Sequence, residues 1–150
     1  MIMFGMEFQN KEPFKNIYVH ALVRDEKGQK MSKSKGNVID PLELIEKYSA
    51  DALRFTLLSM ASPGRDVKLS EDRVKGYRNF LNKIWNANNF LIQNDCKFEN
   101  IETPNDLKLN INKWIFVEFT NTNEKIKKSI DSYRFDEAAR IAYQFVWHSF

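Results

Sequence analysis

Three stretches in the second half of the chain repeat apolar residues at helical spacing, and this pattern constrains the fold most. They run over residues 70–94, 106–133 and 136–150. In the first stretch the apolar positions are Val74, Tyr77, Leu81, Ile84 and Leu91. Apolar residues that recur every three or four positions lie on one face of a helix, and that face packs against other elements. Three such helices with short connections predict an antiparallel helical bundle.

The other face of the first stretch is polar and partly basic. Ser70 is a good N-cap, and Glu71 and Asp72 place negative charge in the first turn, where it suits the helix dipole. Farther along, the polar face carries Lys75, Arg78, Asn82 and Asn89. Periodicity leaves two interpretations of this face open: a solvated surface, or a strip that faces RNA.

A second feature is a small cationic loop, residues 30–37, that contains no carboxylate. Lys30, Lys33 and Lys35 can each present an ammonium group, and two serines add hydroxyl donors. Gly36 permits the positive φ that a tight exit from the loop needs. The formal net charge of the whole chain is only +3, so this cluster is a local positive field that favours a polyanion such as a phosphate chain. A solvated connector is the alternative.

The segments on either side of the loop predict ordered structure. Residues 17–23 are rich in β-branched and aromatic side chains, which favours a buried strand leading into the loop. After the loop, Asp40 is a good N-cap, Pro41 suits the first helical position and Glu43 has the spacing of a capping box. A helix is therefore expected from Asp40 to about Lys47.

The next expected helix, residues 52–58, is mostly apolar and is assigned to the core. Its Arg54 lies three residues after Asp51, so a buried ion pair at helical spacing is the favoured interpretation and contact with an RNA phosphate is the alternative. A turn cluster over residues 61–66 ends this helix. Residues 95–104 are expected to form a polar loop.

Composition excludes several kinds of site. The 150 residues contain no apolar run long enough to span a bilayer and no secretory signal at the start, so a cytoplasmic protein is expected. Cys96 is the only cysteine, which rules out an intrachain disulfide and leaves a thiolate zinc site without ligands; no metal site is predicted. His20 lies near the loop and is interpreted as structural, with ligand contact as the alternative.

Residues 30–34 spell KMSKS, and residues 28–41 resemble the second signature of the class I aminoacyl-tRNA synthetases almost letter for letter. The resemblance implies that ATP is a substrate, with Mg²⁺ expected in the whole enzyme. It implies catalytic roles for Lys33 first and Lys30 second, because cations stabilise the charge that grows on the phosphates when an amino-acid carboxylate attacks. The implied ATP-binding residues are Lys30, Met31, Ser32, Lys33 and Ser34.

The similarity extends along nearly the whole chain and is strongest to the valyl branch of the class. Residues 61–66 and 77–80 resemble the valyl pattern rather than the isoleucyl or leucyl one. Two positions depart from the pattern, since Ala21 and Ser49 stand where these enzymes usually have glycine. A serine in place of the second glycine is expected to cost stability at a helix end without altering the chemistry.

The resemblance also implies an architecture. Residues 1–68 are expected to form the C-terminal end of a catalytic domain and a stem-contact region with the KMSKS loop. Residues 69–150 are expected to form the truncated first part of a helical anticodon-binding domain, so the chain as a whole is mainly α. The partners implied for the whole enzyme are tRNA(Val), ATP and L-valine, without a membrane. The candidate tRNA contacts are Arg54, Lys75 and Arg78.

The same comparison predicts what the chain lacks. No histidine stands in the first ATP signature of the class, and the valine pocket and the editing domain fall outside these residues. No helix start precedes Met1, and Trp147 and Phe150 end the chain without a closing signal, which indicates an excerpt. We expect a monomeric fragment of an enzyme that joins valine to tRNA(Val), inactive alone. The alternative is a stand-alone RNA-binding or helical interaction module.

Overall fold

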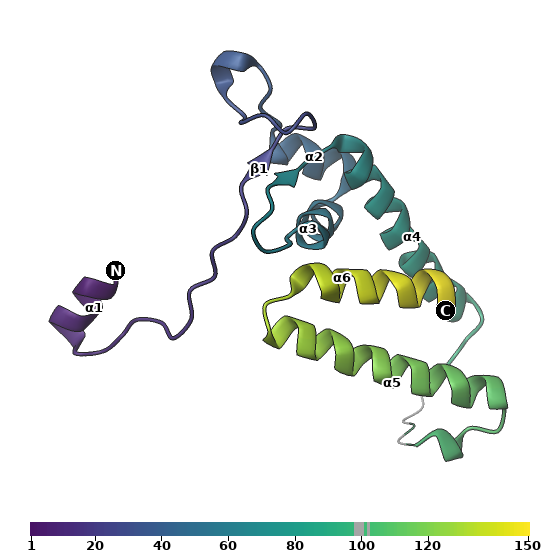
Figure 1. Cartoon of the computed structure of the whole chain (residues 1–150). Coiled ribbons are helices and arrows are strands. Elements are labelled where there is room, and N and C mark those ends of the chain that lie inside the picture. The colour runs from purple at the N-terminus through teal and green to yellow at the C-terminus, as the bar shows by residue number, and fades with distance from the viewer. Residues whose placement is uncertain (98–100, 102) are drawn as a thin grey trace.

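The chain is mainly helical in a computed structural model that describes residues 1–97, 101 and 103–150 (Figure 1). The mainly α prediction is confirmed. None of the described helices combines the length and the apolarity needed to cross a bilayer. In chain order the helices and strands are α1 (Ile2–Gln9), β1 (Val23–Arg24), α2 (Pro41–Tyr48), α3 (Ala50–Ser59), β2 (Val67–Lys68), α4 (Glu71–Gln93), α5 (Asn110–Asp131) and α6 (Phe135–Gln144). Short helical turns cover Lys33–Lys35 (η1), Pro104–Asp106 (η2) and Phe145–Ser149 (η3).

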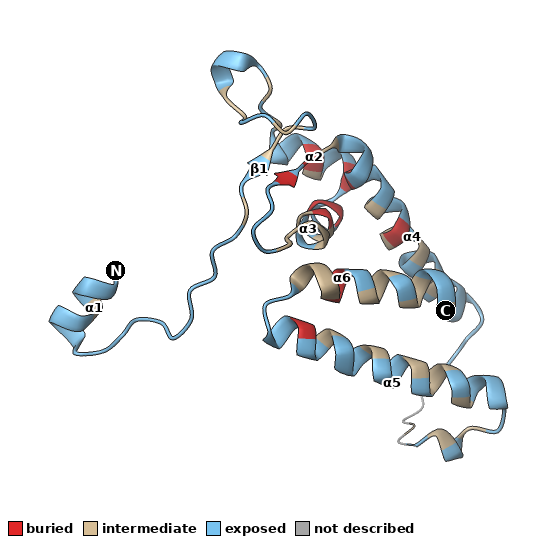
Figure 2. Cartoon of the chain, viewed as in Figure 1, coloured by how far each residue is buried: buried red, intermediate tan, exposed pale blue. Residues whose placement is uncertain are grey.

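The main core forms where α2 and α3 meet the start of α4 (Figure 2). Ala52 and Val74 are fully buried there, and Tyr48 is 8% exposed. The core role predicted for residues 52–58 is therefore confirmed for Ala52, Leu53 and Thr56, which are all buried. The cluster consists of Leu44, Tyr48, Ala52, Leu53, Leu69 and Val74.

The long helices pack in a different order from their order in the sequence. α5 and α6 form an antiparallel hairpin, α6 packs on α3, and α3 packs on α4 (Figure 1). Aromatic rings fill the junction, with the Phe80 ring 5.2 Å from Phe55 and 4.8 Å from Tyr143 between centroids. α3 is thus an internal member of the bundle, because it packs on α4 and on α6.

Helix boundaries differ from the predicted ones by a few residues. The helix predicted from about residue 106 begins at Asn110, after the turn η2. The last helix changes to π geometry at Phe145. Part of the loop predicted over residues 95–104, namely residues 98–100 and 102, lies outside the described residues.

The prediction of a buried strand over residues 17–23 is wrong. Only Val23–Arg24 form β1, which pairs in parallel with Val67–Lys68 of β2. Ile17 and Val19 are 68% and 86% exposed, and the segment before β1 is an extended chain (Figure 1). Its Tyr18 ring packs on Tyr133 and Phe135, where α5 connects to α6, and not on a strand. β-propensity reflects packing against neighbouring strands, and among the described residues this segment has such a neighbour only at its end, where it meets β2.

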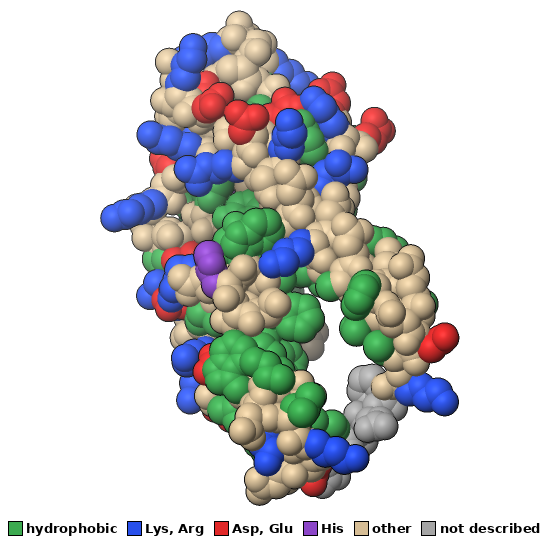
Figure 3. All heavy atoms as spheres, turned by 90° about the vertical axis from the view of Figure 1, so that its right-hand side faces the viewer, with side chains coloured by type: hydrophobic (Ala, Val, Ile, Leu, Met, Phe, Trp, Pro, Cys, Tyr) green, Lys and Arg blue, Asp and Glu red, His purple; other side chains and the backbone are tan. Residues whose placement is uncertain are grey.

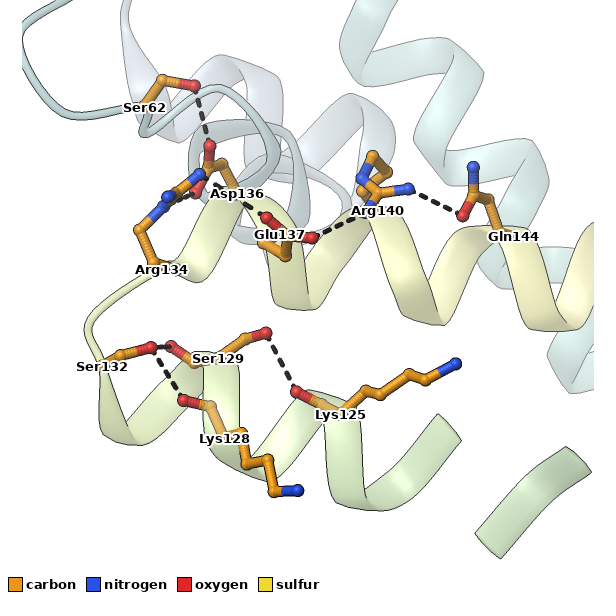
Figure 4. Close-up of polar contacts among 10 residues, drawn as sticks. All are labelled: Ser62, Lys125, Lys128, Ser129, Ser132, Arg134, Asp136, Glu137, Arg140 and Gln144. Carbon is orange, nitrogen blue, oxygen red and sulfur yellow. Dashed lines mark hydrogen bonds and ion pairs between the residues drawn. The ribbon is translucent and has the colours of Figure 1, made fainter. Parts of the chain in front are cut away.

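One polar contact ties the turn after α3 to the start of α6 (Figure 4). Ser62 Oγ donates to Asp136 Oδ2 over 2.9 Å, and Arg134 Nε donates to Asp136 Oδ1 over 3.3 Å. Burial by itself raises the pKa of Asp136, but the hydrogen bonds from Arg134 and Ser62 outweigh it and hold that pKa below the ordinary value. The carboxylate therefore remains charged and keeps both contacts at neutral pH.

Candidate phosphate-binding loop

The KMSKS segment projects from the core as an exposed loop between β1 and α2 (Figure 1). Lys33–Lys35 form the single turn η1, closed by hydrogen bonds from the Lys35 amide to the Ser32 carbonyl (3.1 Å) and from the Gly36 amide to the Lys33 carbonyl (3.2 Å). Gly36 leaves this turn with φ +64°, as predicted, and a Cβ there would meet nothing within 4 Å. Glycine is thus needed at this position because of the positive φ, and not because a side chain would lack space.

The three lysines of the loop are exposed, and none forms an ion pair with a residue in the described part of the chain. Met31, between Lys30 and Ser32, instead packs against the core cluster. The loop therefore turns an apolar residue inward and leaves its ammonium groups uncompensated. This arrangement suits a ligand with several negative charges, because the cations need not be released from protein partners first.

The base of the loop is held by the side chain of Asn37. Its Oδ1 accepts from the Ser32 amide over 2.9 Å, and its Nδ2 donates to the Lys30 carbonyl over 3.2 Å and to Asp25 Oδ2 over 2.9 Å. The sequence reasoning missed this role. An asparagine after a glycine indicates a turn but does not identify its distant partner.

Asp25 is in turn fixed by the tight turn after β1. Its Oδ1 accepts from the Gln29 amide over 2.6 Å, and its carbonyl accepts from the Gly28 amide over 2.9 Å. The hydrogen bond from Asn37 is the main cause that lowers the pKa of Asp25, with smaller contributions from Gln29 and Lys27. A shallow pocket of about 470 Å³ lies at this base, between the turn and residues 35–39.

On the far side of the loop, α2 is capped as predicted. Asp40 precedes Pro41 and accepts from the Leu42 amide over 2.8 Å. At its other end α2 is joined to α4, because Tyr48 donates to Glu71 Oε1 over 2.7 Å and Lys47 forms an ion pair with the same oxygen. A similar contact lies where the chain enters the loop, because Arg24 of β1 forms an ion pair with Asp66, just before β2. The loop thus leaves a scaffold that is fixed on both sides.

The other candidate residues lie apart from this loop in the fold. Arg54 pairs with Asp51 over 3.2 Å, as favoured by its spacing, but at the surface and not in the core. Lys75 and Arg78 are exposed on α4. His20 is exposed in the extended segment, with Nδ1 2.8 Å from the Ala21 carbonyl. Within the described ranges no group of three or more metal-ligating side chains occurs.

The loop itself does not fit a magnesium site. Mg²⁺ prefers carboxylate, water and phosphate oxygens in octahedral geometry, whereas the loop offers ammonium and hydroxyl groups.

Hydrophobic side chains are exposed on the opposite part of the molecule (Figure 3). There an apolar groove of about 720 Å³ lies between α4, α5 and η3, and it contains none of the predicted site residues. Charged side chains of both signs, Lys and Arg among them, lie instead at the end that holds the loop and α2 (Figure 3). The groove and the charged loop are thus separate features.

Comparisons with known proteins agree with this arrangement. The family described as "tRNA synthetases class I (I, L, M and V)" matches residues 1–70, and "Anticodon-binding domain of tRNA ligase" matches residues 112–150. The valine-tRNA ligase of Pelagibacter ubique is 75% identical over all 150 residues, and that of Mesorhizobium japonicum is 56% identical over the same length. The chain belongs to the class I aminoacyl-tRNA synthetases. It spans 17% and 16% of the length of these two relatives.

A solved class I synthetase has the same fold. The LeuRS of Agrobacterium radiobacter K84, in a ternary complex with tRNA and LeuAMS, superposes with a TM-score of 0.80 over 97% of this chain and 20% of its own. The identity between the two sequences is 22%. The likeness therefore establishes the arrangement of the helices and strands in this synthetase segment.

Proposed function

We propose that this segment supplies the phosphate-stabilising loop of a valine-tRNA ligase, which activates valine with ATP and joins it to tRNA(Val). The observation that carries the proposal is the KMSKS loop, which presents three exposed ammonium groups from a braced scaffold. The identity to valine-tRNA ligases over the whole chain supports valine as the amino acid. A cytoplasmic location follows from the same proposal.

In the first reaction a carboxylate oxygen of valine attacks the α-phosphorus of ATP. A new P–O bond forms, the bond from that phosphorus to the bridging oxygen breaks, and pyrophosphate leaves with the electron pair. Negative charge grows on the departing group, and Lys33, aided by Lys30, stabilises it. Met31 holds the loop to the core while Ser32 and Ser34 offer hydroxyl groups to the phosphates.

The second part of the proposal concerns domain organisation and tRNA. Residues 1–68 form the end of the catalytic domain and the stem-contact region, and residues 69–150 form the first part of the anticodon-binding domain. The two family matches, which end at residue 70 and begin at residue 112, support this division. Lys75 and Arg78 are the proposed tRNA contacts, and Arg54 can join them only if its ion pair with Asp51 opens.

The test uses a complete enzyme that contains this segment. The matching residues of the Pelagibacter ubique relative are replaced by this chain, and adenylate formation is measured in single turnovers. Lys33→Ala is expected to slow the step roughly 10²–10³-fold, the loss typical of removing one preorganised donor. Lys27→Ala, a lysine outside the signature, is the matched control and should change the rate little.

Equal effects of the two variants on the rate would mean that the lysines act only through their summed positive charge, with no special role for Lys33. A collapsed thermal melt of Lys33→Ala would make this lysine structural, which its exposed position argues against. The first result would favour an RNA-binding module over a catalytic loop.

A further inference from the structure

We propose that Asn37 is a positioning residue that latches the base of the KMSKS loop and sets where Lys30 and Lys33 stand. This inference rests on the proposed function for its catalytic consequence only. The latch itself is a structural property of the chain and can be tested without any substrate.

The contacts of Asn37 leave its amide one orientation. The Ser32 amide can only donate, so Oδ1 must face it; the Lys30 carbonyl and the ionised Asp25 can only accept, so Nδ2 must face them. All three partners are thus satisfied at 2.9–3.2 Å. An aspartate or an alanine at this position cannot reproduce the set.

The loop has two arms, residues 28–32 before the turn η1 and residues 36–39 after it. Among the described residues, the hydrogen bonds of Asn37 join these two arms below the turn. The backbone bonds within the loop, from Lys35 to Ser32 and from Gly36 to Lys33, close only the turn η1 at its tip. Met31 and Ile39 anchor each arm to the core separately. Asn37 therefore takes the place of the backbone hydrogen bonds that would pair two strands. Its one side chain bonds to the backbone of Lys30 and of Ser32, on either side of Met31.

Asp25 fixes the direction in which Asn37 points. The carboxylate is held by the Gln29 amide within the turn that Gly28 closes at φ +78°, so it cannot follow Asn37 if the loop moves. The result is a connection from the turn after β1, through Asp25 and Asn37, to the arm that carries Lys30. Rotation of the single Asn37 side chain releases this arm while the apolar anchors stay in place.

The first experiment uses the 150-residue chain. Amide hydrogen exchange at Ser32 and Gly36 and tryptic cleavage after Lys30, Lys33 and Lys35 are followed in the wild type and in Asn37→Ala. Exchange and cleavage are expected to rise about tenfold, the effect of losing hydrogen bonds that hold a surface segment. Asn86→Ala, an exposed asparagine of α4 without a described side-chain hydrogen bond, is the control and should leave both rates unchanged.

A pair of exchanged residues tests the connection to Asp25. Asn37→Asp places two carboxylates face to face, and Asp25→Asn places two amide groups there, so each alone should loosen the loop. The double variant restores one donor and one acceptor across the contact and should be more protected than either single variant. Unchanged exchange in Asn37→Ala, or a double variant no better than the worse single one, would overturn the latch.

The second experiment measures adenylate formation in the chimeric ligase described above. Asn37→Ala is expected to lower kcat about 10–100-fold with little change in KM for valine, because misplaced lysines fail mainly in the transition state. Loosened loops with unchanged kcat would show that the latch exists but does not position the lysines. An inert Lys33→Ala would instead overturn the proposed function and leave the exchange result standing.

Discussion

The hydroxyl of Tyr48 donates a hydrogen bond to Glu71 across 2.7 Å, which joins the helix that follows the KMSKS loop to the helix that leads into the bundle. Lys47 pairs with the same carboxylate. Glu71 lies in the first turn of α4, where a negative charge also suits the helix dipole. One side chain thus couples α2 and α4.

This coupling predicts a dependence of stability on acid. The hydrogen bonds from Lys47 and then Tyr48 lower the pKa of Glu71. A carboxyl whose pKa is lower in the folded state than in the unfolded state stabilises the fold above the unfolded value of about 4.3. The contribution is lost as the pH falls through the folded value. Denaturant titrations from pH 7 to pH 2.5 should show that the free energy of unfolding falls less steeply for Glu71→Gln than for the wild type, because one titrating carboxyl is gone. Part of the loss remains, because Asp25 and Asp136 still titrate. Identical slopes would mean that Glu71 is not coupled to folding.

Ser49 carries a backbone strain that a single substitution should release. It ends α2 and caps α3 with φ +84° and ψ +152°, a region that is essentially restricted to glycine and costs about 1–3 kcal/mol otherwise. Ser49→Gly removes this strain but also the cap to the Ala52 amide, a long contact of 3.3 Å, and adds entropy to the unfolded chain. We expect a net stabilisation of about 1 kcal/mol, or roughly 3 °C in Tm.

Ser49→Ala is the matched comparison, since it keeps the strain and loses the cap. It should destabilise the chain by roughly 0.5–1 kcal/mol. Thermal melts in which glycine and alanine have the same effect would show that the conformation at this position is not strained.

The isolated chain should not form aminoacyl-adenylate. It carries the second signature loop but no first ATP signature among its 150 residues, whose only histidines are His20 and His148. The loop alone cannot orient valine against the α-phosphate. The measurement is valine-dependent exchange of radioactive pyrophosphate into ATP, with the chimeric ligase as the positive control. Clear turnover by the purified chain would contradict the prediction.

The polar face of α4 should bind RNA weakly and with strong dependence on salt. Phosphate contacts release condensed counterions, so the logarithm of the association constant falls linearly with the logarithm of the salt concentration. Lys75→Gln and Arg78→Gln should each reduce the slope by about 1, whereas Lys127→Gln on α5 should not. Titrations of tRNA with the four proteins between 50 and 200 mM salt, roughly the range in which such contacts are lost, provide the comparison. Tight binding that is insensitive to salt would contradict the assignment.

The sequence predicted the helices well because their signals are local. The cap at Asp40, the glycine at Gly36 and the pair of Arg54 with Asp51 depend on residues within a few positions of each other. The lysines of the loop were found for the same reason, since they are contiguous. Their catalytic and ATP-binding roles remain predictions.

Features that depend on distant residues could not be predicted in this way. Residues 17–23 have the composition of a strand, but pairing requires a neighbour, and β2 meets this segment just at its end, through the Leu22 carbonyl and Val23. The contact of Asn37 with Asp25 depends on a turn that brings the two together over a dozen positions. The packing of α3 between α4 and α6 likewise follows from three-dimensional fit and not from periodicity.

The parallel pairing of β1 with β2 has a consequence for synthesis of the protein. Val23 leaves the ribosome well before its partner Val67, and the KMSKS loop lies between them. At about 5–20 residues per second, the nascent chain waits several seconds before the second strand emerges. Until then the arm that enters the loop lacks β2 as its partner, and the ion pair of Arg24 with Asp66 cannot yet hold that arm in place.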